Sequence, residues 1–145
     1  MKEQFTTYLK GIGMSDILTR RAEEIHEFYR AICPEEITDI FVSEFVKEDG
    51  IREYENLWFF SQKYVMEAKS FILKDLFDMT IIHKQLKYWT IEKMSYDFVN
   101  AMEKSRMTMS VKFETVSGIF KASKENCDFL RDVFRRNILP NLIIS

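Results

Sequence analysis

The run Leu57-Trp58-Phe59-Phe60 places four large apolar side chains next to one another. Successive side chains of a β-strand point to opposite faces of a sheet, so a strand with this run is apolar on both faces. An antiparallel sheet with one face in water would instead alternate apolar and polar residues. The run therefore predicts a sheet that is covered on both sides.

The segment before this run supplies a helix that can cover one side. Apolar residues recur with helical spacing from Ile17 to Ile32, Ser15 is a suitable N-cap, and Pro34 disfavours continuation of the helix. We therefore predict a helix over residues 15–33, with a shorter helix before it. The helix-spaced apolar residues of the shorter helix are Phe5, Leu9 and Ile12.

The apolar side of the longer helix is the candidate cover for the sheet. We expect it to lie against the outer face, near Trp58 and Phe60, because an apolar patch of that size is rarely left exposed. The contacting side chains would be Ile25, Phe28 and Ile32.

Residues 37–122 have the composition of short antiparallel strands. β-branched and aromatic residues dominate several segments, and Asp49-Gly50 is a strong hairpin signal. Residues 95–106 fit neither the helical nor the strand repeat of apolar residues, so they are predicted to form a loop or a single helical turn. The expected strands, seven in all, cover residues 40–46, 51–60, 64–68, 77–82, 87–93, 107–113 and 119–122.

A further amphipathic helix is predicted over residues 124–139. Ser123 can cap it and Pro140 marks its end. We expect its apolar stripe to close the open end of a strongly bent sheet. The stripe consists of Cys127, Leu130, Phe134 and Ile138.

This order, antiparallel strands followed by one helix, resembles the pleckstrin-homology-like superfold over residues 37–139. The segment Phe59-Phe60-Ser61-Gln62-Lys63-Tyr64-Val65-Met66 is similar to a strand-turn-strand motif of its bacterial and GRAM-type members. Ser61 stands where those members often have Thr, and Tyr64 stands where they commonly have Arg. The resemblance implies an α+β fold, with a seven-stranded antiparallel barrel or bent sheet closed by the C-terminal helix.

The length of 145 residues is typical of one domain, so we expect a single domain over residues 1–145. An accessory helical segment (1–36) would pack outside the antiparallel sheet (37–122), and the C-terminal helical segment (123–139) would close it.

Charge and composition exclude several kinds of partner. A net charge of −2 and an isoelectric point near 5.8 argue against a nucleic-acid-binding protein. The charges of the predicted loop 47–52 cancel, whereas phosphoinositide recognition needs several converging cations. No apolar run is long enough to span a bilayer, and no secretory signal is seen. Cys33 and Cys127 indicate no disulfide framework, so we expect a cytoplasmic protein with reduced thiols.

Few residues of the sequence suggest a catalytic, metal-binding or partner-binding role. His26 lies among charged residues of the predicted helix and is expected at the surface, and no ligand spacing predicts a metal site. Cys127 lies on an apolar stripe, where a thiol packs as a small hydrophobe. A scattered basic set is a candidate partner surface, although solvated lysines are the plainer interpretation. Its members are Lys69, Lys74, His83, Lys84 and Lys87.

The sequence thus predicts a non-catalytic binding or scaffold domain with a protein partner and no cofactor. The alternative is a small cone-shaped α+β protein of the nuclear-transport-factor-2-like kind, which binds a ligand or acts as an enzyme in an apolar cavity. In that case His83 or Asp78 inside the cone would be the general base. The two hypotheses differ in whether the last helix closes the sheet or leaves a cavity open.

Overall fold

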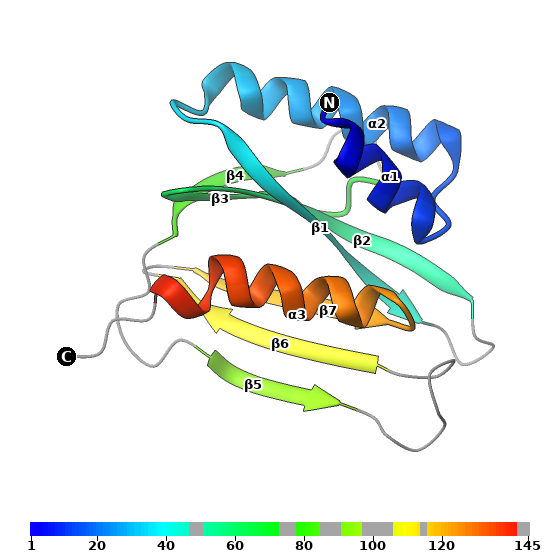
Figure 1. The fold of residues 1–145 in the computed structure, drawn as a ribbon, viewed down its shortest axis with the longest axis vertical. Helices are drawn as coiled ribbons and strands as arrows, with labels where there is room; N and C mark the ends of the chain where they lie inside the picture. The colour runs from blue at the N-terminus through cyan, green and yellow to red at the C-terminus, as the bar shows by residue number, and fades with distance from the viewer. Residues whose placement is uncertain (47–50, 73–77, 85–90, 97–105, 114–115, 142–145) are drawn as a thin grey trace.

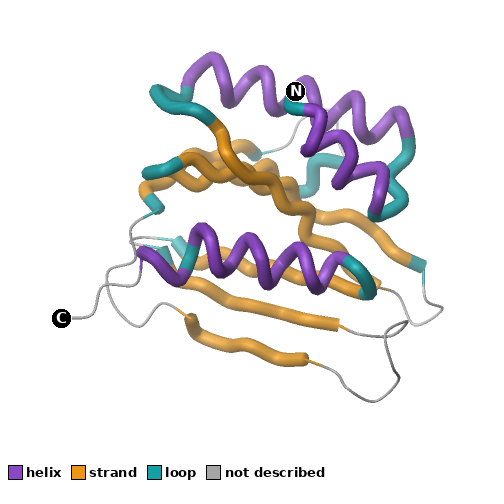
Figure 2. Tube along the Cα trace, viewed as in Figure 1, coloured by secondary structure: helices purple, strands orange, loops and turns teal. Residues whose placement is uncertain are grey.

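The computed structural model describes residues 1–46, 51–72, 78–84, 91–96, 106–113 and 116–141, as Figure 1 and Figure 2 show. Within these residues, two helices come first, seven strands follow, and one helix with a short 3-10 turn comes last. The helices are α1 (Glu3–Gly11), α2 (Asp16–Ile32) and α3 (Asn126–Asn137), and the 3-10 turn covers Leu139–Asn141. The strands are β1 (Ile37–Val46), β2 (Arg52–Ser61), β3 (Tyr64–Ala68), β4 (Met79–His83), β5 (Ile91–Tyr96), β6 (Arg106–Lys112) and β7 (Ser117–Ser123).

Most of the predicted elements are present. The helix predicted over residues 15–33 is α2, and the strand predicted over residues 64–68 is β3. Ser15 caps α2, because its Oγ accepts a hydrogen bond from the Leu18 N–H at 3.3 Å. The Asp49-Gly50 signal and most of the predicted loop 95–106 lie outside the described residues.

The described strands form two separate antiparallel sheets, so the expected seven-stranded barrel or single bent sheet is wrong. The first sheet has the order β1-β2-β3-β4 and the second has the order β5-β6-β7. A barrel needs continuous backbone pairing where its edge strands meet. Where β1 meets β7, a side chain takes the place of backbone pairing: the Ser43 Oγ accepts a hydrogen bond from the Lys121 N–H at 3.0 Å. The fold is therefore α+β with two sheets.

The apolar run of β2 is buried on both faces, and each face meets a different layer. The Phe59 ring lies against α2, with its centroid 6.0 Å from that of Tyr29. The Trp58 ring lies against the second sheet, with its centroid 4.4 Å from that of Phe120 on β7. Figure 1 accordingly shows α1 and α2 on the side of the first sheet that is turned away from the second. The predicted contact of α2 with Trp58 and Phe60 is therefore wrong.

The side chains through which α2 contacts the sheet also differ in part from those predicted. Ile25 is buried as predicted, but Phe28 and Ile32 are 48% and 51% exposed. The Tyr29 hydroxyl donates a hydrogen bond to the Glu67 backbone carbonyl at 2.6 Å. Tyr29 and Ile25 lie four residues apart and share one side of the helix, so this bond fixes the side that faces the sheet.

Helix α3 fills the space between the two sheets. Its apolar side chains pack against Phe60, Met109 and Phe120 and leave no room there for a water-sized molecule. The helix begins at Asn126, because the Ser123 hydroxyl donates to the Glu44 carboxylate at 2.6 Å instead of capping the helix. The buried apolar residues of this segment are Cys127, Leu130, Val133, Phe134 and Ile138.

Gly118 on β7 is tightly enclosed by buried rings. A Cβ at this position would lie 2.8 Å from Trp58 Cη2 and 3.1 Å from Phe113 Cε2. Because overpacking a core typically costs about 1–3 kcal/mol, Gly118→Ala is expected to lower the free energy of unfolding by that amount. Equilibrium urea unfolding measures the effect. Gly11→Ala is the matched control, since nothing lies within 4 Å of its Cβ; equal effects of the two substitutions would contradict this packing.

Candidate functional site

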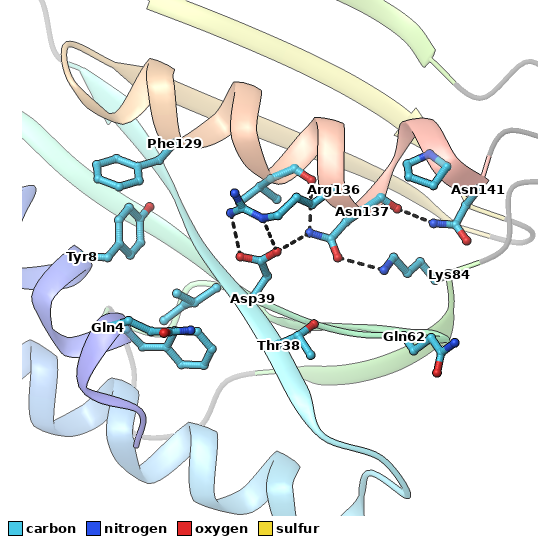
Figure 3. A pocket seen from close by; sticks show the side chains of 14 residues that line it. Gln4, Tyr8, Thr38, Asp39, Gln62, Lys84, Phe129, Arg136, Asn137 and Asn141 are labelled. Atoms are coloured by element: carbon cyan, nitrogen blue, oxygen red, sulfur yellow. Dashed lines mark hydrogen bonds and ion pairs between the residues drawn. The ribbon is translucent and has the colours of Figure 1, made fainter.

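A groove runs between α1, the first residues of β1, and α3, and Figure 3 shows the side chains that line it. Its volume is about 870 Å³. Helices α1 and α3 both contact β1, so the groove joins residues from the two ends of the chain. We call it the β1–α3 groove. It is lined by Gln4, Phe5, Tyr8, Thr38, Asp39, Ile40, Gln62, Lys84, Phe129, Val133, Arg136, Asn137, Pro140 and Asn141.

The centre of the groove is a continuous polar network. Arg136 donates two hydrogen bonds to the Asp39 carboxylate, from Nε and Nη2, each at 2.8 Å. Asn137 donates to the same carboxylate at 2.8 Å and accepts from Lys84 Nζ at 2.8 Å. The bonds to Asp39 raise the pKa of the Arg136 guanidinium. Such charge-assisted pairs fix geometry, so α3 and β1 are held in register along the groove.

Lys84 is the buried charge of the groove. Its side chain donates to the Ser61 backbone carbonyl at 2.9 Å and to Asn137, and the residue is 5% exposed. Burial lowers the pKa of its ammonium group, while the charges of Asp39 and Glu35 act in the opposite direction. A lysine ammonium has three donors and a full positive charge. The two oxygens that accept from Lys84 are neutral, so these bonds use two of its donors without balancing its charge.

The other end of the groove is apolar. The rings of Tyr8 and Phe129 meet edge to face, with centroids 4.6 Å apart. Phe129 is 38% exposed, and Phe5, Ile40 and Val133 continue the apolar wall. This end offers a place for an apolar side chain of a ligand.

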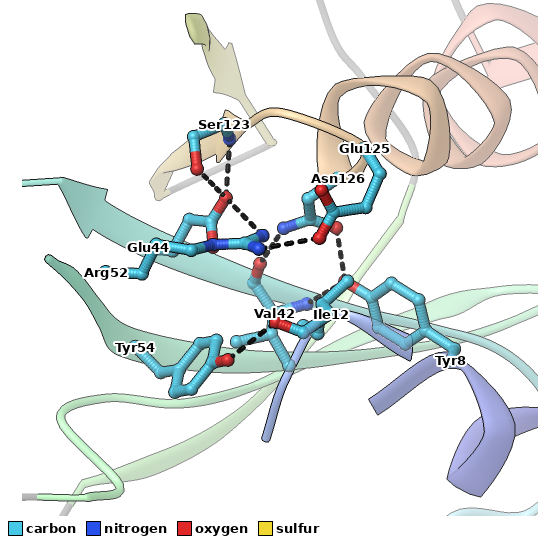
Figure 4. A network of polar contacts seen from close by, with 9 residues as sticks. All are labelled: Tyr8, Ile12, Val42, Glu44, Arg52, Tyr54, Ser123, Glu125 and Asn126. Carbon is cyan, nitrogen blue, oxygen red and sulfur yellow. Dashed lines mark hydrogen bonds and ion pairs between the residues drawn. The ribbon is translucent and has the colours of Figure 1, made fainter. Parts of the chain in front are cut away.

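One edge of β1 borders the groove and carries polar contacts, as Figure 4 shows. The Val42 N–H donates to Tyr8 Oη at 3.0 Å, and Asn126 Nδ2 donates to the Val42 carbonyl at 3.0 Å. Alternate residues of an antiparallel strand direct their backbone groups to the same edge, so Ile40 directs its N–H and carbonyl toward the groove. Among the described hydrogen bonds, none joins these two groups to a residue outside the sheet.

A buried carboxylate holds the far end of β1. Glu44 is 2% exposed and accepts from Arg52 Nε at 2.9 Å and from the Ser123 N–H at 2.5 Å, as Figure 4 shows. Arg52 also donates to Glu125 at 2.6 Å. These bonds tie β1 and β2 to the start of α3, which positions one wall of the groove.

The predicted basic set does not form one patch within the described residues. Lys69 follows β3 and His83 ends β4, and these strands pair antiparallel, so the two residues lie at opposite ends of the hairpin. Lys84 is buried in the groove, which excludes a simple solvated role for it. Lys74 and Lys87 lie outside the described residues.

His26 is 4% exposed, so the predicted surface position is wrong. Its ring centroid lies 5.9 Å from that of Phe5 and 5.3 Å from that of Phe59. Burial lowers the pKa of the imidazole. The prediction failed because it relied on charged neighbours in the sequence, which point to other sides of a helix.

The residues considered for catalysis have little reactive character. Cys127 is 2% exposed, and burial raises the pKa of its thiol to about 11, which disfavours a thiolate at neutral pH. Asp78 and His83 are exposed, so neither lies in a closed cavity. The part of the chain that the structure describes contains no group of three or more His, Cys, Asp and Glu side chains that could hold a metal ion.

Sequence reasoning missed the central residues of the groove. No motif or residue spacing pointed to Asp39, Arg136 or Asn137. The polar positions among apolar ones at Asp39 in β1 and at Asn137 in α3 are the signal that a search for buried polar pairs would use.

Comparison with known proteins gives no relative, since no family model, curated protein or solved structure matches this chain. Among the described helices, none is long and apolar enough to cross a membrane. The described structure is that of an α+β domain with two antiparallel sheets and a groove beside β1.

Glu67 makes stability depend on pH. Glu67 lies on β3 opposite Trp58 of β2 and is 5% exposed. Burial raises the pKa of its carboxyl group from 4.5 to about 7, although the positive charge of Lys69 acts in the opposite direction. The folded state therefore holds a proton that the unfolded chain releases, and the free energy of unfolding falls as pH rises through this interval. At pH 8, Glu67→Gln is expected to be more stable than the parent by about 1–3 kcal/mol.

Urea unfolding between pH 4.5 and pH 8 measures this effect. Glu55→Gln is the control, since the Glu55 side chain is 37% exposed and its partner Lys121 lies 3.5 Å away. The same pH slope in Glu67→Gln and in the parent would contradict the assignment.

Proposed function

We propose that this protein is a non-catalytic binding domain whose β1–α3 groove receives an extended segment of a partner protein. The proposal rests on the edge of β1 at Ile40, a residue that lines the groove and is 6% exposed. Strand alternation with Val42 directs the Ile40 backbone toward the groove, which has an apolar end and a polar centre. Extended peptides bind exposed strand edges through their backbone, and pockets beside the edge select their side chains. The groove supplies both requirements.

The chemistry of the groove supports binding rather than catalysis. Asp39 is engaged by Arg136 and Asn137, and an engaged carboxylate is a weak general base. The filled core around α3 offers no apolar cavity there, which favours this function over the cone-shaped alternative. The order of strands followed by a helix supports a relation to the pleckstrin-homology-like superfold, without the barrel. In this proposal the domain acts in the cytoplasm, and both of its cysteines are buried.

Selection of peptides from a library displayed with free C-termini, against the purified full chain, tests the proposal. The selected peptides are expected to shift the backbone NMR signals of β1 at Thr38 and Ile40 and of α3 from Phe129 to Asn137. Phe129→Ala should weaken their binding about tenfold or more, because Phe129 forms the apolar end of the groove.

Phe28→Ala is the matched control, because Phe28 is also a partly exposed phenylalanine but lies on α2. It should leave binding unchanged. Selection of no peptide, or of peptides that depend on Phe28 and not on Phe129, would overturn the proposal.

A further inference from the structure

We propose that the partner segment in the β1–α3 groove ends in a free C-terminal carboxylate, which binds the ammonium group of Lys84. This inference rests on the proposed function and adds the chemistry of the segment. Its evidence is the arrangement of charges and donors in the groove, as Figure 3 shows.

The groove has an excess of positive charge. The charged residues that line it are Asp39, Lys84 and Arg136. Both oxygens of Asp39 accept from Arg136, and one also accepts from Asn137, so these two opposite charges neutralise each other. The charge of Lys84 is left as the excess.

The nearby carboxylate of Glu35 is already engaged by other groups. Its Oε1 accepts from the Ser61 hydroxyl at 2.6 Å and from the Lys63 N–H at 2.5 Å. These contacts, chiefly the Ser61 bond, hold the pKa of Glu35 below its ordinary value. Among the described residues, no carboxylate is in hydrogen-bond contact with Lys84 Nζ, whose two bonds end on neutral oxygens.

A buried charge is normally in contact with an opposite charge, because removing an ion from water is costly. Lys84 is more than nine-tenths buried, lines the groove and uses two of its three donors. The third donor and the unmatched charge suit an anion that enters the groove. A singly charged carboxylate matches one ammonium, whereas a phosphate group typically needs several cations.

The strand edge indicates where that carboxylate comes from. An extended segment that pairs with the backbone of Ile40 can direct its last residue along the groove toward Lys84. An apolar side chain about three or four residues before the terminus would then contact Tyr8 and Phe129 at the other end of the groove. A chain terminus provides a backbone and a carboxylate in one continuous line, which the side chain of Asp or Glu does not.

Two peptide pools test the inference with the full chain immobilised. One pool contains N-acetylated octapeptides of random sequence with a free C-terminus, and the other contains the same peptides as C-terminal amides. The free-acid pool is expected to be retained at least about tenfold more strongly. Addition of a retained free-acid peptide should also raise the pKa of Lys84, followed through its side-chain NMR signal, because the bound anion favours the charged amine.

Two variants locate the effect. Lys84→Met removes the cation and should make the two pools bind equally. Arg136→Gln leaves Asp39 uncompensated in the groove and should reduce the preference several-fold; it serves as the decisive variant if Lys84→Met does not fold. Arg135→Gln is the control, because Arg135 lies on the same helix, 75% exposed, and pairs with Asp132.

The outcomes separate the two proposals. Equal retention of both pools, with dependence on Phe129, would overturn the carboxylate inference and leave the proposed function intact. A preference for free acids that survives in Lys84→Met, or in Arg136→Gln where Lys84→Met does not fold, would overturn the assignment to Lys84. Retention of neither pool would overturn the proposed function itself.

Discussion

A chain that begins at residue 34 is expected not to fold cooperatively. It lacks the segment of α1 and α2, whose buried large apolar side chains include Phe5, Leu9, Ile12, Ile25 and Tyr29. Full burial of such a side chain contributes about 1.5–3 kcal/mol. Their sum is comparable to the entire stability of a typical domain, about 5–15 kcal/mol. Loss of the helices would also expose the Phe59 face of the first sheet.

Circular dichroism during thermal unfolding, together with size-exclusion chromatography, checks this expectation. We expect aggregation or a transition without a cooperative midpoint. Ile17→Ala in the full chain is the control, since Ile17 belongs to α2 but is 82% exposed, and it should leave the midpoint nearly unchanged. A soluble 34–145 chain that unfolds in one sharp transition would show that the helices are dispensable.

Replacement of Glu44 by Ala is expected to lower the free energy of unfolding by about 3–5 kcal/mol, the usual cost of removing one partner of a buried ion pair. Glu44 accepts two hydrogen bonds from Arg52 and two from Ser123, and the Arg52 side chain is only 15% exposed. The substitution leaves the Arg52 guanidinium with Glu125 as its ion-pair partner among the described residues. Urea unfolding at neutral pH measures the loss.

A second substitution separates charge from packing. In the Glu44→Ala background, Arg52→Met should recover part of the lost stability, because it removes the buried cation that the first substitution leaves behind. Glu55→Ala is the control, because Glu55 also lies on β2 but its ion pair with Lys121 is partly exposed, and the cost should be within about 1 kcal/mol. Similar losses in Glu44→Ala and Glu55→Ala would refute a special role for the buried network.

The local elements were predictable because their signals are local. Ser15 and Pro34 set the limits of α2, and the β-branched and aromatic run at 64–68 is β3. The apolar run of β2 also correctly required a layer on each face. These predictions depend on periodicity and on backbone preferences of a few neighbouring residues.

The groove was not predictable in the same way. Lys84 was treated as one of five scattered basic residues, although its ammonium is enclosed by Ser61 and Asn137. The bond from Lys84 to Asn137 joins residues 53 positions apart, and the bonds from Arg136 to Asp39 span 97 positions. Neither separation leaves a trace in local spacing.

The amino-acid pattern was enough to predict the succession of helices and strands, the α+β class, and a sheet covered on both faces. Long-range packing sets three further features: the strands divide into two sheets, α2 covers Phe59 rather than Trp58, and Lys84 is buried beside Asn137. The reason is physical: backbone conformation responds to neighbours within one turn or one strand pair. The environment of a side chain is instead set by whichever distant elements pack around it, so burial, charge pairing and the groove arise only when the chain is folded.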